Sequence, residues 1–234
     1  MIPCLKRPSR LSLFMKRPVW IFRGAAYLIT LGLSHAGVPS EKARSILEAG
    51  NQRFTEGKAL AHNWQKGQVA KTGAIGQTPS VAVLTCADSR TPPEVIFDMG
   101  VGDLFVCRNA GGFDTPEVNA TFEYGVAVLG VHTILVLGHT KCGAVTATLE
   151  GKPVPGNISL LTKSLRPGIE KIHQEHADLS QEAQLSHAVE ALVRYQMNVL
   201  IQNSELLHKS KMDGKLQVIG AVYDVETGRV HFLD

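Results

Sequence analysis

Short runs of apolar and β-branched residues recur along the chain, and each is bounded by glycine, proline or polar residues. Runs of this length and composition are typical of buried strands. They span residues 80–85, 103–107, 132–137, 216–223 and 229–233. Because only the turn residues 224–228 separate the last two runs, we expect those strands to pair antiparallel.

Between the strands, apolar positions recur at helical spacing. Ser40 can cap a first helix over residues 40–54, and Thr115 followed by Pro116 is a strong start signal for another that runs to about residue 130. Further helical stretches are expected near residues 92–100, 143–149, 158–176 and 180–210.

The alternation of apolar strands with helices predicts an α/β fold. Crossover helices place consecutive strands parallel and cover both faces of the sheet. We therefore expect a mainly parallel central sheet with flanking helices and an antiparallel C-terminal edge strand. No repeat or linker interrupts the pattern, so residues 37–234 are predicted to form one domain.

The N-terminal segment has a different character. Residues 1–40 hold six Lys or Arg and no acidic residue, and residues 24–34 then run without charge. Eleven residues match the apolar core of a secretory signal and are too few to span a bilayer. Small residues at 34 and 36 complete the pattern, so we expect a signal segment over residues 1–36, cut after Ala36.

Such a signal predicts export to a periplasm, a thylakoid lumen or the extracellular space. Three alternatives stay open: an organelle transit peptide, an uncleaved membrane anchor over residues 19–33, and a basic arm that packs on the domain. A membrane is an expected partner only if this segment stays attached.

Charge changes once the segment is set apart. The whole chain has a formal net charge of +3 from 24 Lys and Arg against 21 Asp and Glu, but without the six leader positives it keeps 18 against 21. A mature chain near −3 has no clustered positive charge with which to bind nucleic acid, so we expect no such partner. Its three cysteines, at spacings of 21 and 35, do not form a disulfide framework.

Two segments carry the candidate chemistry. The first strand ends in TCADSR (85–90), and the third ends in GHTKCG (138–143). Open parallel sheets place their sites beyond the carboxyl ends of the strands, so Cys86, His139 and Cys142 can converge there. Two thiolates and an imidazole suit zinc, and three protein ligands leave a fourth position open, as in catalytic zinc sites.

The simpler alternative is that Cys86 and Cys142 are small buried hydrophobic residues. Two charged residues that follow Cys86 favour the metal site instead. Asp88 lies two residues from a candidate ligand, where it can accept a hydrogen bond from a metal-bound water, and Arg90 can hold that carboxylate in a bidentate pair. A surface ion pair would contribute little to stability and needs no such neighbours.

With these motifs the sequence resembles the β-class carbonic anhydrases, whose signatures are C-x-D-x-R and H-x-x-C. The likeness extends from about residue 45 to the C-terminus. It includes the segments GQTP (76–79), FDMGVGDLFVCRNAGG (97–112) and FEYGVAVLGV (122–131).

The resemblance implies one zinc ion per subunit, held by Cys86, His139 and Cys142 with water or hydroxide as the fourth ligand. Asp88 and Arg90 match the catalytic dyad of the family, in which the aspartate accepts the hydroxide proton. In some members this aspartate ligates zinc instead, in an inactive state.

The resemblance also implies a substrate pocket. Gln77 matches an amide that hydrogen-bonds carbon dioxide or bicarbonate, and Gly143 matches a backbone N–H donor. Phe105 and Tyr124 match apolar walls of the pocket, with Tyr124 supplied across a dimer interface. We therefore expect a homodimer or a higher homo-oligomer.

The expected function is the reversible hydration of carbon dioxide to bicarbonate and a proton. Two alternatives remain on the same scaffold. One is a hydrolase of carbonyl sulfide or carbon disulfide, and the other is a non-catalytic module that binds zinc or bicarbonate. The Asp88–Arg90 pair speaks against the module, because a structural zinc ion needs neither residue.

Overall fold

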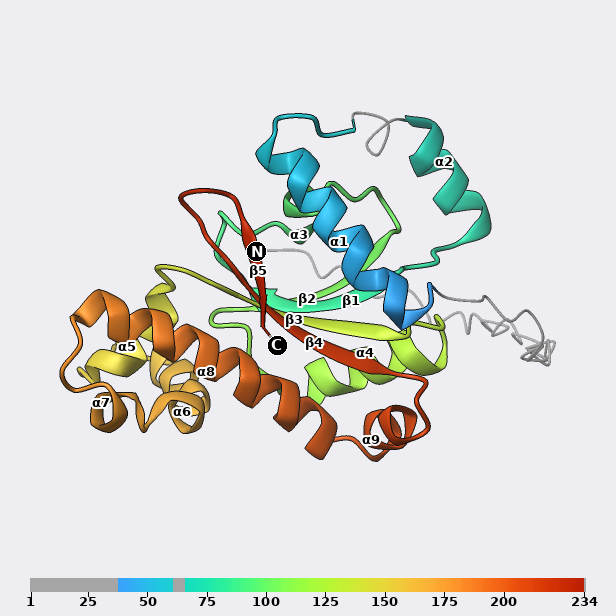
Figure 1. The fold of residues 1–234 in the computed structure, drawn as a ribbon. Coiled ribbons are helices and arrows are strands. Elements are labelled where there is room, and N and C mark those ends of the chain that lie inside the picture. The colour runs from blue at the N-terminus through green and yellow to red at the C-terminus, as the bar shows by residue number, and fades with distance from the viewer. Residues whose placement is uncertain (1–37, 61–65, 234) are drawn as a thin grey trace, which may run out of the picture. The chain divides into compact units, whose positions relative to one another are not determined.

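One sheet occupies the middle of the molecule (Figure 1). In residues 38–60 and 66–233, which the computed structural model describes, five strands pair in the order β2-β1-β3-β4-β5. They are β1 (Val81–Cys86), β2 (Leu104–Asn109), β3 (Thr133–His139), β4 (Gln217–Tyr223) and β5 (Val230–Leu233). The first four run parallel, and β5 is antiparallel to β4, so the predicted fold class is confirmed.

Helices cover both faces of this sheet (Figure 1). They are α1 (Ser40–Thr55), α2 (Lys66–Ile75), α3 (Pro93–Ile96), α4 (Pro116–Ala127), α5 (Gly143–Glu150), α6 (Ile158–Ile169), α7 (Ile172–Glu175), α8 (Gln181–Gln202) and α9 (Glu205–Met212). In this part of the chain no helix is long and apolar enough to cross a membrane. The predicted leader over residues 1–36 lies outside the described residues.

Each strand buries alternate side chains on opposite faces. Val81 and Val83 of β1 pack in the core beneath α1 and α3, whereas Ala82 and Leu84 pack against the layer formed by α4 to α9. All six residues of β1 are buried. A strand covered on both faces needs apolar residues at every position, which explains why β1 and β3 read as unbroken apolar runs.

The helices differ from the predicted ones at several points: Pro39 rather than Ser40 is the N-cap of α1, and α3 is shorter than the stretch expected over residues 92–100. Helix α2 was not predicted, because it has no apolar stripe: Val69 and Ile75 are both exposed. The stretches over residues 158–176 and 180–210 are each two helices rather than one. Ser204 separates α8 from α9, since its side chain accepts a hydrogen bond from Leu207 N at 3.0 Å and so caps α9.

Strand order decides what the sheet brings together. Strands β1 and β3 are neighbours, with Thr85 opposite Leu137 in their register. Their carboxyl ends therefore lie side by side, at the edge of the sheet where the two candidate segments begin.

Candidate metal centre

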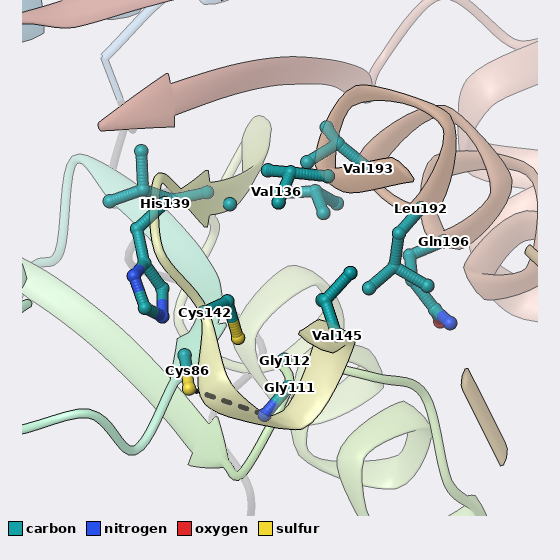
Figure 2. Close-up of a pocket in the computed structure, with 13 residues that line it drawn as sticks. Cys86, Gly111, Gly112, Val136, His139, Cys142, Val145, Leu192, Val193 and Gln196 are labelled. Carbon is teal, nitrogen blue, oxygen red and sulfur yellow. Dashed lines mark hydrogen bonds between the residues drawn. The ribbon is translucent and has the colours of Figure 1, made fainter. Parts of the chain in front are cut away.

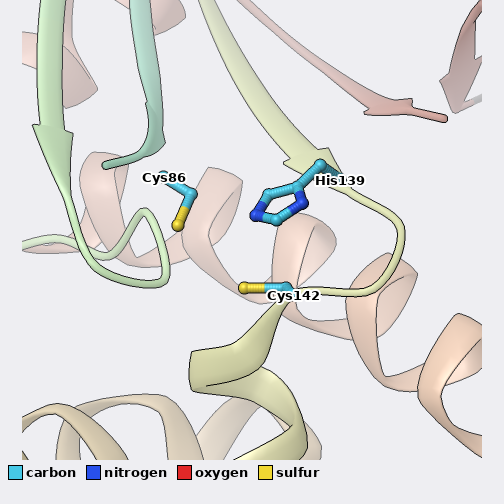
Figure 3. Close-up of side chains that lie close together, drawn as sticks. All are labelled: Cys86, His139 and Cys142. Carbon is cyan, nitrogen blue, oxygen red and sulfur yellow. The ribbon is translucent and has the colours of Figure 1, made fainter. Parts of the chain in front are cut away.

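The structure brings the three predicted ligands together (Figure 3). Cys86 is the last residue of β1, His139 is the last residue of β3, and Cys142 is the N-cap of α5. Their sulfur and nitrogen ligand atoms all lie within 4.8 Å of one another, and all three residues are buried. Figure 3 shows both thiols and the imidazole ring turned toward a common space.

The hydrogen bonding of His139 fits a metal ligand. Its Nδ1 lies 2.9 Å from the backbone carbonyl of Thr140, which can only accept, so Nδ1 carries the proton. Nε2 is buried and has no hydrogen-bond partner in the described part of the chain. An unpaired buried nitrogen is costly unless something binds it. A cation between Nε2 and the two sulfur atoms would satisfy it, and a carbonyl partner on Nδ1 is the usual arrangement for such a ligand.

The two thiols influence each other's ionisation. The Cys142 thiol beside it is the largest cause that lowers the pKa of Cys86, to about 4, with smaller contributions from the nearby His139 ring and from the backbone N–H groups of Gly111 and Asp88. The pKa of Cys142 is raised by the neighbouring Cys86 and by burial. Metal ligands must be deprotonated, so a bound metal cation would favour the thiolate form of both residues.

A pair of glycines completes the surroundings of Cys86. Gly111 N donates a hydrogen bond to Cys86 Sγ at 3.2 Å (Figure 2). Gly112 has φ +65°, and a Cβ atom there would lie 3.0 Å from the backbone carbon of Thr85. Glycine is thus required at this position, because the loop passes close to the backbone of β1. The sequence alone indicates only an ordinary turn here.

Asp88 and Arg90 form the predicted pair beside this cluster. Arg90 Nε and Nη2 donate to the two carboxylate oxygens of Asp88 at 2.9 and 2.7 Å, and Arg90 N donates to Oδ1 at 2.9 Å. These bonds hold the pKa of Asp88 well below its usual range. Asp88 Oδ2 lies 4.0 Å from His139 Nε2, so the carboxylate borders the space between the ligand atoms.

The ion pair leads to a prediction about pH. Replacing Arg90 by glutamine should raise the pKa of Asp88 toward its ordinary value near 4, because the largest cause of the depression is removed. Because the pKa of Asp88 is lower in the folded protein than in the unfolded chain, the ionised carboxylate stabilises the fold at pH values above the unfolded pKa. This stabilisation is lost as the pH falls through the folded-state pKa. Carbon-13 NMR titration of the Asp88 carboxyl in both proteins measures the shift, and an unchanged midpoint would contradict it.

Sequence reasoning missed the role of Arg108, at the end of β2. Its guanidinium donates to the carbonyl oxygens of Cys86 at 3.0 Å and of Asp88 at 2.7 Å. Arg90 in turn donates to the carbonyl of Lys141 at 3.3 Å, which ties the two ligand-bearing loops together. These contacts are made to backbone atoms, so no side-chain motif in the sequence indicates them.

A small apolar cavity of about 10 Å³ adjoins the cluster on its inner side (Figure 2). Val136, Val145, Leu192 and Val193 turn toward it, and all four are buried. Neither Asp88 nor Arg90 lines it. The inner side of the ligands is therefore small and mostly apolar, although Gln196 also lines it, and the charged Asp88 carboxylate lies beside the ligands outside this cavity.

Two predicted substrate residues lie at opposite ends of β1. Gly143 follows Cys142 directly, and a Cβ atom there would meet nothing within 4 Å, so its backbone borders open space beside the ligands. Gln77 is exposed and precedes β1, whereas Cys86 ends that strand. Since a strand rises about 3.3 Å per residue, the length of β1 separates Gln77 from the cluster within one chain.

Phe105 and Tyr124 lie together near the edge of the sheet. Their ring centroids are 6.2 Å apart. Phe105 is on the edge strand β2, opposite Ala82 and thus four residues back from Cys86 along the sheet, and Tyr124 on α4 is 49% exposed. Phe105 packs partly buried against the core, and Tyr124 beside it is half exposed at the surface of the chain.

The sequence of this chain is similar to those of known proteins that share one family. Residues 81–230 match the family model described as carbonic anhydrase. The chain is 32% identical over 196 residues to "Carbonic anhydrase 2" of Mycobacterium tuberculosis, covering 82% of this chain and 92% of that protein. It is also 35% identical over 185 residues to a carbonic anhydrase of Pseudomonas aeruginosa, covering 72% of this chain and 80% of that one.

Solved structures agree with these relatives. The β-carbonic anhydrase CafA of Aspergillus fumigatus superposes with a TM-score of 0.67 at 29% identity, covering 82% of this chain and 90% of that one. The Coccomyxa β-carbonic anhydrase, solved with acetazolamide, gives 0.66 at 31% identity, covering 81% and 85%. A β-carbonic anhydrase of Sordaria macrospora, described as tetrameric, gives 0.66 at 26% identity, covering 79% and 93%.

Proposed function

The chain belongs to the β-carbonic anhydrase family, and we propose that it hydrates carbon dioxide reversibly at one zinc ion per subunit. The observation that carries the proposal is the buried Cys86–His139–Cys142 cluster with the carboxylate of Asp88 beside it. Two thiolates and one imidazole are a typical donor set for zinc, and three protein ligands leave a position open for chemistry.

Zinc held by these three residues would lower the pKa of water and so make hydroxide available closer to neutral pH. The Asp88 carboxylate, which borders the space between the ligand atoms, would accept a hydrogen bond from the nucleophilic water or hydroxide and fix its orientation. Arg90 keeps the carboxylate ionised and fixed in direction through its bidentate contact. The small, mostly apolar cavity on the inner side of the cluster leaves the side of Asp88 for this chemistry.

Carbon dioxide is small, linear and apolar, so its site needs an apolar wall rather than a charged clamp. We propose that Phe105 and Tyr124 supply this wall, and Gln77 an amide, to the metal centre of a second copy. Their support is their position: all three lie away from the cluster of their own chain, and Tyr124 is half exposed on α4. The homodimer or larger assembly that this requires fits with the tetrameric relative from Sordaria macrospora.

The proposed interface can be tested at Val128, which is 62% exposed near Tyr124. Val128→Glu should shift the protein toward monomer, because a buried interface does not tolerate an unpaired carboxylate. Activity should fall roughly tenfold or more, since the apolar wall is misplaced, while each chain keeps its metal ligands.

Sedimentation velocity and metal analysis measure both effects. Leu160→Glu is the matched control, because Leu160 is 60% exposed on α6, away from β2 and α4. A Val128→Glu protein that remains oligomeric with full activity would exclude this face.

Stopped-flow hydration of carbon dioxide, with metal content determined on the same sample, tests the proposed function directly. Rates on carbonyl sulfide and carbon disulfide separate the alternative hydrolase, for which those substrates would react faster than carbon dioxide. Stoichiometric zinc without any turnover would favour the non-catalytic module. Export through residues 1–36 remains a prediction from the sequence.

A further inference from the structure

The loop that joins His139 to Cys142 is held from one side by the β4–β5 hairpin. We infer that Thr140, the first residue of that loop, is a positioning residue that fixes the orientation of the His139 ring for the metal. The inference rests on the proposed metal site and extends it to a residue outside the ligand set and the dyad.

Three hydrogen bonds fasten Thr140 to the hairpin. Its backbone N–H donates to the carbonyl of Tyr223 at 2.9 Å. Its hydroxyl accepts from the backbone N–H of Val225 at 3.1 Å and donates to Asp224 Oδ1 at 3.4 Å. Both partners of the hydroxyl thus belong to the turn between β4 and β5, more than eighty residues along the chain.

Asp224 is itself a fixed acceptor. Its carboxylate accepts hydrogen bonds from Glu226 N at 2.8 Å and from the Thr227 hydroxyl at 2.9 Å. These contacts close the turn between two paired strands, so the hairpin is ordered without help from a metal. The frame to which Thr140 is bound is therefore independent of the site that it supports.

The connection to the metal runs through the Thr140 carbonyl. That oxygen accepts the Nδ1 proton of His139 at 2.9 Å, so its position sets the tilt of the ring and the direction of Nε2. The following residue, Lys141, has φ +56°, a left-handed conformation that is unfavourable for a lysine. A loop with such a residue keeps its shape only when its surroundings hold it, and the Thr140 hydroxyl is one of the groups that do so.

The surroundings of Thr140 decide which substitution is informative. A groove of about 230 Å³ borders Thr140 and Asp224, so a smaller side chain would admit water that could replace the hydroxyl. Valine keeps the shape of threonine and removes only the hydrogen-bonding oxygen. Serine keeps the oxygen and removes only a methyl group, so Thr140→Val and Thr140→Ser form a matched pair.

Zinc affinity of the full chain, measured by competition with a chromophoric chelator, is the first test. Thr140→Val should weaken zinc binding by roughly tenfold, as for other groups that orient a metal ligand, and Thr140→Ser should stay close to the parent. In the proton NMR spectrum, the Nδ1–H signal of His139 should shift or broaden only in the valine variant. Equal zinc affinity and an unchanged imidazole signal in both variants would overturn the inference.

Two further variants keep the test decisive. Thr162→Val removes a comparable hydroxyl that donates only within its own helix, to the Ser159 carbonyl at 3.2 Å, and should leave zinc affinity unchanged. If Thr140→Val fails to fold, Asp224→Ala removes the acceptor of the Thr140 hydroxyl from the hairpin side and should weaken zinc binding in the same direction. Because the readouts are zinc affinity and an NMR signal, a chain that passes them but does not hydrate carbon dioxide would contradict only the proposed function.

Discussion

Replacing Cys142 by alanine is expected to remove zinc from the protein and to reduce carbon dioxide hydration by a hundredfold or more. Loss of a ligand should cost more than the tenfold to hundredfold lost when a group that merely orients a ligand is removed. Only Cys86 and His139 would then remain within 4.8 Å of each other as possible ligands in the described cluster. Two ligands do not complete either type of zinc site.

Metal content by mass spectrometry and the stopped-flow rate are measured on the same preparation. Cys107→Ala is the matched control, since Cys107 is a free cysteine that is half-buried on β2 and lies outside the cluster. The control should keep about one zinc ion per chain and near-parent activity. Full zinc content in Cys142→Ala would refute the assignment of this residue as a ligand.

Replacing Asp88 by alanine should have the second large effect, a fall in kcat of about 10²- to 10⁴-fold with zinc retained. Positioned groups that exchange protons or hydrogen bonds with a nucleophile typically contribute this much. Asp88 Oδ2 lies 4.0 Å from His139 Nε2, and its loss leaves Arg90 without a carboxylate partner beside the site. The three ligands themselves are untouched, so binding of the metal should survive.

The decisive comparison is therefore the rate per bound zinc. Asp213→Asn serves as the control, because Asp213 also pairs with basic side chains but lies beyond the C-terminal end of α9. It should be indistinguishable from the parent. An Asp88→Ala protein within about threefold of the parent rate would show that Asp88 has no part in catalysis, since it falls far outside the range for such groups.

The sheet and the metal ligands could be predicted from the sequence for the same reason. Strands β1 and β3 are buried on both faces, so most of their residues are apolar, and each apolar run gives way to a polar segment at Cys86 or His139. Helix α2 could not be predicted in this way, because it buries no apolar stripe. Its Gln68 side chain instead donates to the carbonyl of Val101 at 3.2 Å, a contact that leaves no periodic pattern.

The residues that support the site from outside the ligand set could not be predicted from the sequence for a related reason. Arg108 and Thr140 act on backbone atoms of segments that are distant in sequence, and Gly112 acts by lacking a side chain. None of these effects has a characteristic spacing along the chain. The roles of Gln77 and Tyr124 came from the family resemblance alone, and their distance from the cluster of their own chain became visible only in three dimensions.

The positions of Phe105 and Tyr124 have a kinetic consequence. The metal ligands come from a single chain, whereas the proposed apolar wall comes from another. The fraction of chains that bind zinc should then not depend on the protein concentration. The number of complete active sites, by contrast, should rise with the square of the protomer concentration when dimers are scarce. A dilute population of newly made chains would hold metal without turnover, and activity would begin only as their concentration rises.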